Sequence, residues 1–91
     1  MARSAIARAT PRSDFTVAIE WRDGSSSTID FRVEIARGGA LRHLGEPALF
    51  LHRLFVQAAG ESLAWETPEG LVDFHADELW RRTHAKPVAA E

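Results

Sequence analysis

The chain has 91 residues, of which 45% are hydrophobic and 26% charged, with a net charge of −2 and no cysteine. This length suits one domain with a single core, and the composition is ordinary for a folded protein. The lack of cysteine excludes a disulfide scaffold, a thiol nucleophile and a zinc or iron–sulfur site held by cysteine. No apolar run approaches the roughly 18 residues of a membrane-spanning helix, so we expect no membrane insertion.

Positive charge is concentrated at the N-terminus. Residues 1–12 hold three arginines and no acid, whereas the remainder carries eight Lys or Arg against thirteen Asp or Glu. We predict that residues 1–12 form a disordered basic arm, because they offer too little apolar surface to offset the entropy of ordering. The open alternative is an arm that contacts phosphate or an acidic partner. The acidic body argues against nucleic-acid binding by the isolated chain.

Two segments with the periodicity of strands follow this arm. Residues 14–21 and 28–35 each place a hydrophobic side chain at every second position, as a half-buried strand does. Between them lies Asp23-Gly24, a strong hairpin signal. We therefore predict an antiparallel hairpin with one face in the core and a register that the alternation specifies.

The second half of the chain predicts two short helices and three strands. Pro47 is expected to open a helix, since the first helical turn tolerates its missing N–H. A short strand is expected at 54–58, and two more between residues 63 and 74, joined by a turn at residues 67–70 with proline and glycine at favourable positions. The last helix is expected to start near Asp77, where a carboxylate favours the helix dipole.

These elements predict an α+β domain at residues 13–82, followed by a C-terminal tail at 83–91. It would hold a small antiparallel sheet in the order β-β-α-β-β-β-α, with one short helix packed on the sheet and a short C-terminal helix. Four aromatic side chains from different elements are expected to share one buried cluster: Phe31, Phe50, Trp65 and Phe74. The three tryptophans are expected in or beside the core rather than on a surface that stacks bases.

The sequence offers no recognisable set of catalytic residues. Its four histidines lack the spacing of a metal site, and its serines lack the signature of a nucleophile elbow. Asp77 and Glu78 are neighbours on a helix, so their carboxylates face different ways and do not form a pair. We therefore predict that the protein is not an enzyme and binds no metal or cofactor.

Several motifs occur in a characteristic order. They are LGEPALF at residues 44–50, Ile29-Asp30-Phe31 upstream, and downstream Trp65, Pro68-Glu69-Gly70, Asp73, Asp77, Leu79 and Trp80. This order resembles that of a small bacterial family, domain of unknown function 2442 (DUF2442), over about residues 14–80. Two residues between Trp65 and Pro68, and one extra residue before Asp73, depart from the family pattern and predict a longer hairpin.

The resemblance implies a genomic context and a kind of partner rather than an enzymatic activity. The family has no established enzymatic activity or cofactor, and its members are often encoded beside another small protein in pairs that look like toxin–antitoxin modules. We therefore expect a protein-interaction module of the bacterial cytoplasm, either antitoxin-like or a phage-type inhibitor. Its partner would be the product of an adjacent gene, and a homodimer is a further expectation.

The expected contact surfaces are a sheet edge, the turn at residues 66–71 and the C-terminal helix. Six residues on the turn and helix are the candidates for binding a partner: Glu66, Glu69, Asp77, Trp80, Arg81 and Arg82. The alternative function is a nucleic-acid-associated transcriptional regulator that uses the basic arm together with Arg81, Arg82 and Lys86.

Overall fold

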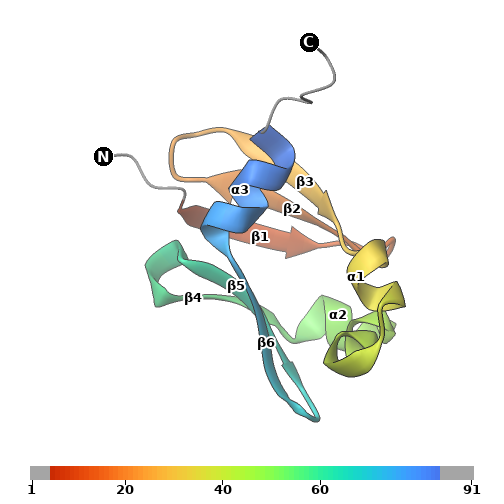
Figure 1. Cartoon of the computed structure of the whole chain (residues 1–91). Helices are drawn as coiled ribbons and strands as arrows, with labels where there is room; N and C mark the ends of the chain where they lie inside the picture. Colours follow the sequence, from red (N-terminus) through yellow and green to blue (C-terminus); the bar gives the residue numbers. More distant parts are fainter. Residues whose placement is uncertain (1–4, 85–91) are drawn as a thin grey trace.

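The computed structural model describes residues 5–84, so the expectations for residues 1–4 and 85–91 lie outside the described part of the chain (Figure 1). The predicted α+β class is confirmed. The strands form two three-stranded antiparallel sheets, whereas the sequence predicts one small sheet. The aromatic core lies between these sheets and the short helices.

Sheet A holds the N-terminal strands in the order β1-β2-β3. They are β1 (Ile6–Pro11), β2 (Thr16–Trp21) and β3 (Ser26–Asp30). The alternation in β2 works as predicted, because Val17, Ile19 and Trp21 are all buried. The predicted hairpin joins β2 to β3, where the Asp23 carboxylate accepts the N–H of Ser25 at 2.8 Å.

Strand β1 overturns the expectation of a disordered arm. Ile6–Pro11 pairs antiparallel with β2, from Ile6 opposite Trp21 to Pro11 opposite Val17, and Ile6 is only 2% exposed. The low apolar content of residues 1–12 predicts disorder, but β1 is held by backbone hydrogen bonds to β2 and by the buried side chain of Ile6. The domain therefore begins upstream of the predicted residue 13.

The second predicted strand is also too long. Strand β3 ends at Asp30, and residues Arg32–Ala36 form a short helix, α1. The Asp30 carboxylate accepts the backbone N–H of Arg32 at 2.9 Å, a local hydrogen bond that competes with strand pairing. Val33 is consequently 62% exposed, while Phe31 stays buried. Over so few residues, the hydrophobic pattern fits one turn of helix as well as a strand.

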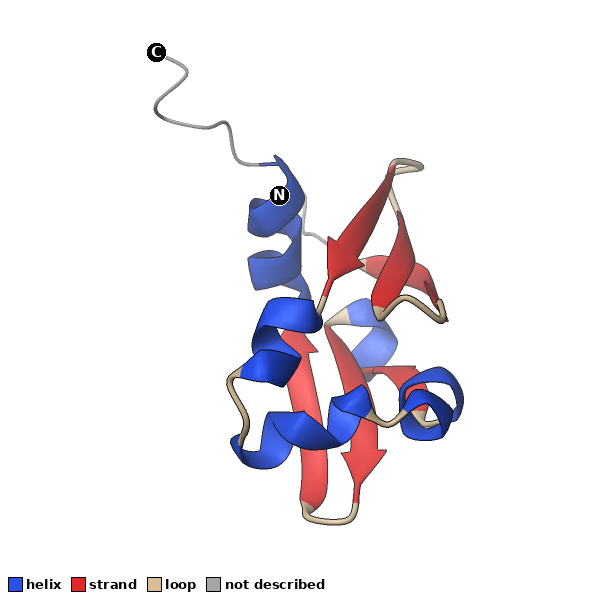
Figure 2. Cartoon of the chain, turned by 90° about the vertical axis from the view of Figure 1, so that its right-hand side faces the viewer, coloured by secondary structure: helices blue, strands red, loops and turns tan. Residues whose placement is uncertain are grey.

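A group of helical segments separates the two sheets in the sequence. The 3₁₀ segment η1 (Gly39–Gly45) follows α1, and helix α2 (Pro47–His52) begins at Pro47 as predicted. These segments pack on one another and lie together on one side of the molecule (Figures 1 and 2). Phe50 of α2 points inward and is fully buried.

Sheet B holds the C-terminal strands in the order β4-β5-β6. They are β4 (Leu54–Gln57), β5 (Ser62–Thr67) and β6 (Gly70–His75), with a short 3₁₀ segment η2 (Ala58–Gly60) between β4 and β5. The turn between β5 and β6 lies where the sequence predicts it. Helix α3 (Ala76–His84) follows β6 directly and runs past the predicted domain end at residue 82.

The four aromatic residues expected in the core form one cluster. The Phe31 ring lies 5.1 Å from that of Trp65 and 5.0 Å from that of Phe74, centroid to centroid. Phe50 stacks on Trp65 at 5.1 Å, and the Trp65 indole N–H donates to the Phe50 carbonyl at 3.0 Å. Phe31, Phe50 and Trp65 are fully buried, and Phe74 is half-buried. This cluster joins the end of sheet A to sheet B and α2.

Candidate functional site

The six residues predicted to bind a partner do not form one surface. Glu66 and Glu69 lie at the β5–β6 hairpin, whose tip is at the far end of the molecule from the C-terminal end of α3 (Figure 1). The other four lie along α3: Asp77, Trp80, Arg81 and Arg82. The hairpin and the helix are therefore two separate candidates.

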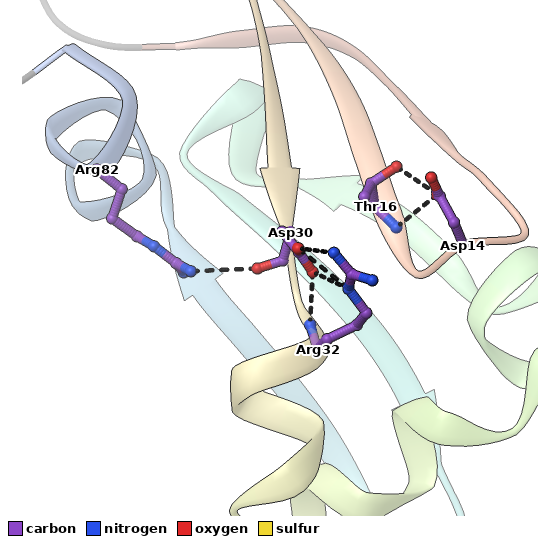
Figure 3. A network of polar contacts seen from close by, with 5 residues as sticks. All are labelled: Asp14, Thr16, Asp30, Arg32 and Arg82. Atoms are coloured by element: carbon purple, nitrogen blue, oxygen red, sulfur yellow. Dashed lines mark hydrogen bonds and ion pairs between the residues drawn. The ribbon is translucent and has the colours of Figure 1, made fainter.

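On α3, Arg82 is already engaged within the fold. Its guanidinium lies 3.0 Å from the Glu34 carboxylate and 5.8 Å from the centre of the Phe31 ring. It also donates to the Asp30 carbonyl at 3.4 Å (Figure 3). Because these contacts join α3 to α1 and to the end of β3, Arg82 acts as a structural clamp.

Of the other α3 candidates, Trp80 and Asp77 are only partly exposed, whereas Arg81 is exposed. Trp80 is half-buried, with its ring edge against Trp21 at a centroid distance of 5.0 Å. The backbone N–H of Asp77 donates to Nδ1 of His75 at 3.2 Å, so His75 caps the start of the helix. Arg81 is exposed and makes no polar contact within residues 5–84.

Two aspartates fix the chain turns around sheet A (Figure 3). The hydroxyl of Thr16 donates to Asp14 at 2.6 Å, and this bond lowers the pKa of Asp14. Arg32 donates to Asp30 from its side chain at 2.6 Å and from its backbone, and these bonds lower the pKa of Asp30 to about 2. Both carboxylates are satisfied locally, so they shape the backbone rather than a reaction centre.

At the hairpin, Glu69 is tied to the helical group. Its carboxylate accepts from His43 at 3.1 Å and from Arg42 at 2.8 Å. The hydrogen bond from His43, followed by the charge of Arg42, lowers the pKa of Glu69. The turn is thereby pinned to η1, which gives Glu69 a structural role that the sequence does not reveal.

Glu66 borders an open cleft beside the hairpin. Seven residues of α2, β5 and β6 and of the segments between them line the cleft, which has a volume of about 440 Å³: Leu49, Arg53, Glu66, Thr67, Pro68, Gly70 and Leu71. The Glu66 carboxylate lies 3.8 Å from the Arg53 guanidinium, with both side chains largely exposed. A surface ion pair of this kind contributes little to stability, so both groups stay available to a partner.

Sheet B has one core face and one outer face. Trp65 pairs with Val72 and Leu63 with Phe74 on the core side. The side chains at alternate positions therefore point to the outer face. That face carries five exposed residues around the small, buried Ala64: Phe55, Glu66, Leu71, Asp73 and His75. Sequence reasoning missed Phe55, Leu71 and Asp73, although Leu71 occupies the opposite phase to the core residue Val72.

The described residues hold no group of three or more His, Asp or Glu placed to bind a metal ion. Within residues 5–84 no helix is long and apolar enough to cross a membrane. Of the basic set expected for a regulator, Arg8 pairs with Glu20 at 3.9 Å and Arg82 with Glu34 at 3.0 Å, so each of these two cations already has an acidic partner within the fold.

Comparisons with protein families, with curated proteins and with solved structures find no match for this chain. The resemblance to DUF2442 therefore stays a prediction from the order of the motifs. The outer face of sheet B, with the cleft beside Glu66, is the best candidate for a functional site.

Proposed function

We propose that the protein is a non-enzymatic protein-interaction module whose partner contacts sheet B. The observation that carries the proposal is the outer face of this sheet, where Phe55 is 38% and Leu71 52% exposed. Exposed hydrophobic side chains set among charged ones are typical of surfaces that bind another protein. The neighbouring cleft beside Glu66 adds a recess into which a partner side chain can fit.

The partner proposed here is a small protein encoded by an adjacent gene, in an antitoxin-like or inhibitory pair. This assignment rests on the resemblance to DUF2442 and on the outer face described above. A cytoplasmic location belongs to the same proposal.

The test is co-expression with the product of an adjacent gene, followed by co-purification and titration calorimetry. Leu71→Ser and Phe55→Ser should each weaken the complex at least about fivefold, the effect of losing roughly 1 kcal/mol at a contact residue. Val33→Ser is the matched control, because Val33 is also an exposed hydrophobic residue but lies on α1. The proposal fails if no complex forms, or if Val33→Ser weakens it as much as Leu71→Ser does.

The salt dependence of binding distinguishes the alternative function, a nucleic-acid-associated regulator, from a protein-interaction module. Binding to duplex DNA should lose about 0.9 log units of affinity per log unit of salt for each phosphate contacted. We expect no measurable duplex binding near a physiological salt concentration of about 0.15 M. Micromolar binding there, lost when Arg8 and Arg12 are both changed to Ala, would favour the regulator instead.

A further inference from the structure

The two sheets have four edge strands, and three of them are covered. The outer side of β3 faces α3, where Thr83 donates to the Ser27 hydroxyl at 3.1 Å and Arg82 to the Asp30 carbonyl. Strands β1 and β4 pack against each other. Neither therefore presents an unobstructed row of backbone N–H and C=O groups. In contrast, β6 pairs with β5 on one side and with no described strand on the other.

The register of the hairpin fixes which backbone groups β6 presents. Thr67 pairs with Gly70 across a two-residue turn, so this pair is mutually hydrogen-bonded, and such pairs recur at every second position. The N–H and C=O groups of Val72 and Phe74 therefore bond to β5. Those of Leu71, Asp73 and His75 point to the free edge, and all three residues are exposed.

The segment of the chain that contains this edge is acidic. Residues 54–80 contain no lysine or arginine but six carboxylates: Glu61, Glu66, Glu69, Asp73, Asp77 and Glu78. Glu61 and Glu78 form no ion pair within the described part of the chain. Asp73, in the middle of β6, has only a long hydrogen bond from Gln57 at 3.4 Å. Glu66 and Glu69 pair with Arg53 and Arg42 from outside this segment, but Asp73, at the middle of the edge, has no cation beside it among the described residues.

We infer that β6 accepts an extended, cationic segment of the partner protein as a fourth strand of sheet B. This inference rests on the proposed function and specifies the surface and the chemistry of the partner. Exposed strand edges bind extended peptides through main-chain hydrogen bonds, and side chains on the two faces give the specificity. Here a lysine or arginine would lie opposite Asp73, and an apolar side chain opposite Leu71.

A second copy of the chain fits this edge less well. Two β6 strands paired antiparallel about Asp73 would place the two Asp73 carboxylates directly opposite each other, and like charges in that position are destabilising. Any other register still brings together two segments without lysine or arginine. Charge complementarity thus selects a basic partner over self-association.

The test uses a labelled peptide of about eight residues with the repeat Lys-Thr-Val-Thr, a typical strand length or slightly more. In this repeat lysine and valine alternate along one face of the strand, so they can lie opposite Asp73 and Leu71, which share the outer face. Fluorescence polarisation measures its affinity, and amide hydrogen exchange by NMR locates the contact on the full chain. Binding should slow the exchange of the Leu71, Asp73 and His75 amides. It should leave the Val72 and Phe74 amides unchanged, because these already bond to β5. The same peptide with glutamate in place of each lysine should not bind.

Asp73→Lys should weaken the peptide about five- to tenfold. Glu20→Lys changes the net charge equally on an exposed position of sheet A and should change the affinity less than about twofold. The inference is overturned if the lysine peptide does not bind, if exchange slows equally at all five amides or at none, or if both variants weaken binding alike. If the adjacent-gene partner still co-purifies with Asp73→Lys at full affinity, the proposed function stands and the placement on β6 is wrong.

Discussion

The docking of β1 onto the rest of the domain depends on one glycine, and this gives a sharp prediction. Gly60 has φ +97°, and a Cβ atom there would lie 2.6 Å from the carbonyl oxygen of Ile6 and 3.0 Å from its nitrogen. Both contacting atoms belong to the backbone of β1, so rotation of a side chain cannot relieve the clash. Gly60→Ala must therefore shift β1 or the segment before β5.

Gly24 provides the matched control, since its φ is +95° and nothing lies within 4 Å of its Cβ position. A left-handed backbone costs alanine about 1–2 kcal/mol, partly offset by a gain of about 0.4–1 kcal/mol from the less flexible unfolded chain. Gly24→Ala should therefore cost about 0.8 kcal/mol, taking the middle of each range. Gly60→Ala adds overpacking worth about 1–3 kcal/mol, so its total cost should be about 3 kcal/mol.

Urea unfolding followed by tryptophan fluorescence measures both costs from the midpoint and slope. Faster amide exchange in β1 should accompany Gly60→Ala and be absent from Gly24→Ala. Equal free energies of unfolding for the two variants would refute the close approach of Gly60 to Ile6, and with it the place of β1 in the core.

Three further predictions follow from single contacts. Ile6→Ala should lower the free energy of unfolding in urea by about 2–4 kcal/mol, because Ile6 is buried in the core. If the arm were disordered, the same substitution would cost nothing. Arg82→Ala should destabilise by about 1–3 kcal/mol, since it leaves the largely buried carboxylate of Glu34 without its cation, while Arg81→Ala should change the melting temperature by less than about 1 °C. The pKa of Asp30 falls from its ordinary 3.8 to about 2 on folding. Its ionised form therefore stabilises the fold above about pH 4, and this contribution is lost between about pH 4 and pH 2. Asp30→Asn should accordingly make the unfolding midpoint less dependent on pH over that range.

Local chemistry made parts of this fold predictable from the sequence. The β5–β6 turn follows from Pro68 and Gly70, the start of α2 from Pro47, and the buried face of β2 from its alternation. Strand β1 could not be predicted in the same way, because its order depends on a partner strand and not on its own composition. The helix at Arg32–Ala36 was missed because one hydrogen bond, from the Arg32 amide to Asp30, decides against the strand.

The candidate site was harder to predict than the fold. Glu69 and Arg82 looked like free surface charges, yet each is held by residues far away in the sequence, Glu69 by Arg42 and Arg82 by Glu34. Sequence spacing gives no measure of such pairings. The exposure of Leu71 could have been predicted from the sequence, because a hydrophobic residue on the opposite phase to Val72 must lie on the outer face of the hairpin.

The free edge of β6 and its charge have a common physical explanation. Proteins protect exposed strand edges from self-pairing with charged side chains, and within residues 5–84 Asp73 occupies the middle of the one edge that no other element covers. A lysine there would also block self-pairing, but it would repel a cationic segment. A carboxylate blocks a second copy and attracts a basic strand at once. The same side chain thus argues against the expected homodimer through β6 and for a heterologous, positively charged partner.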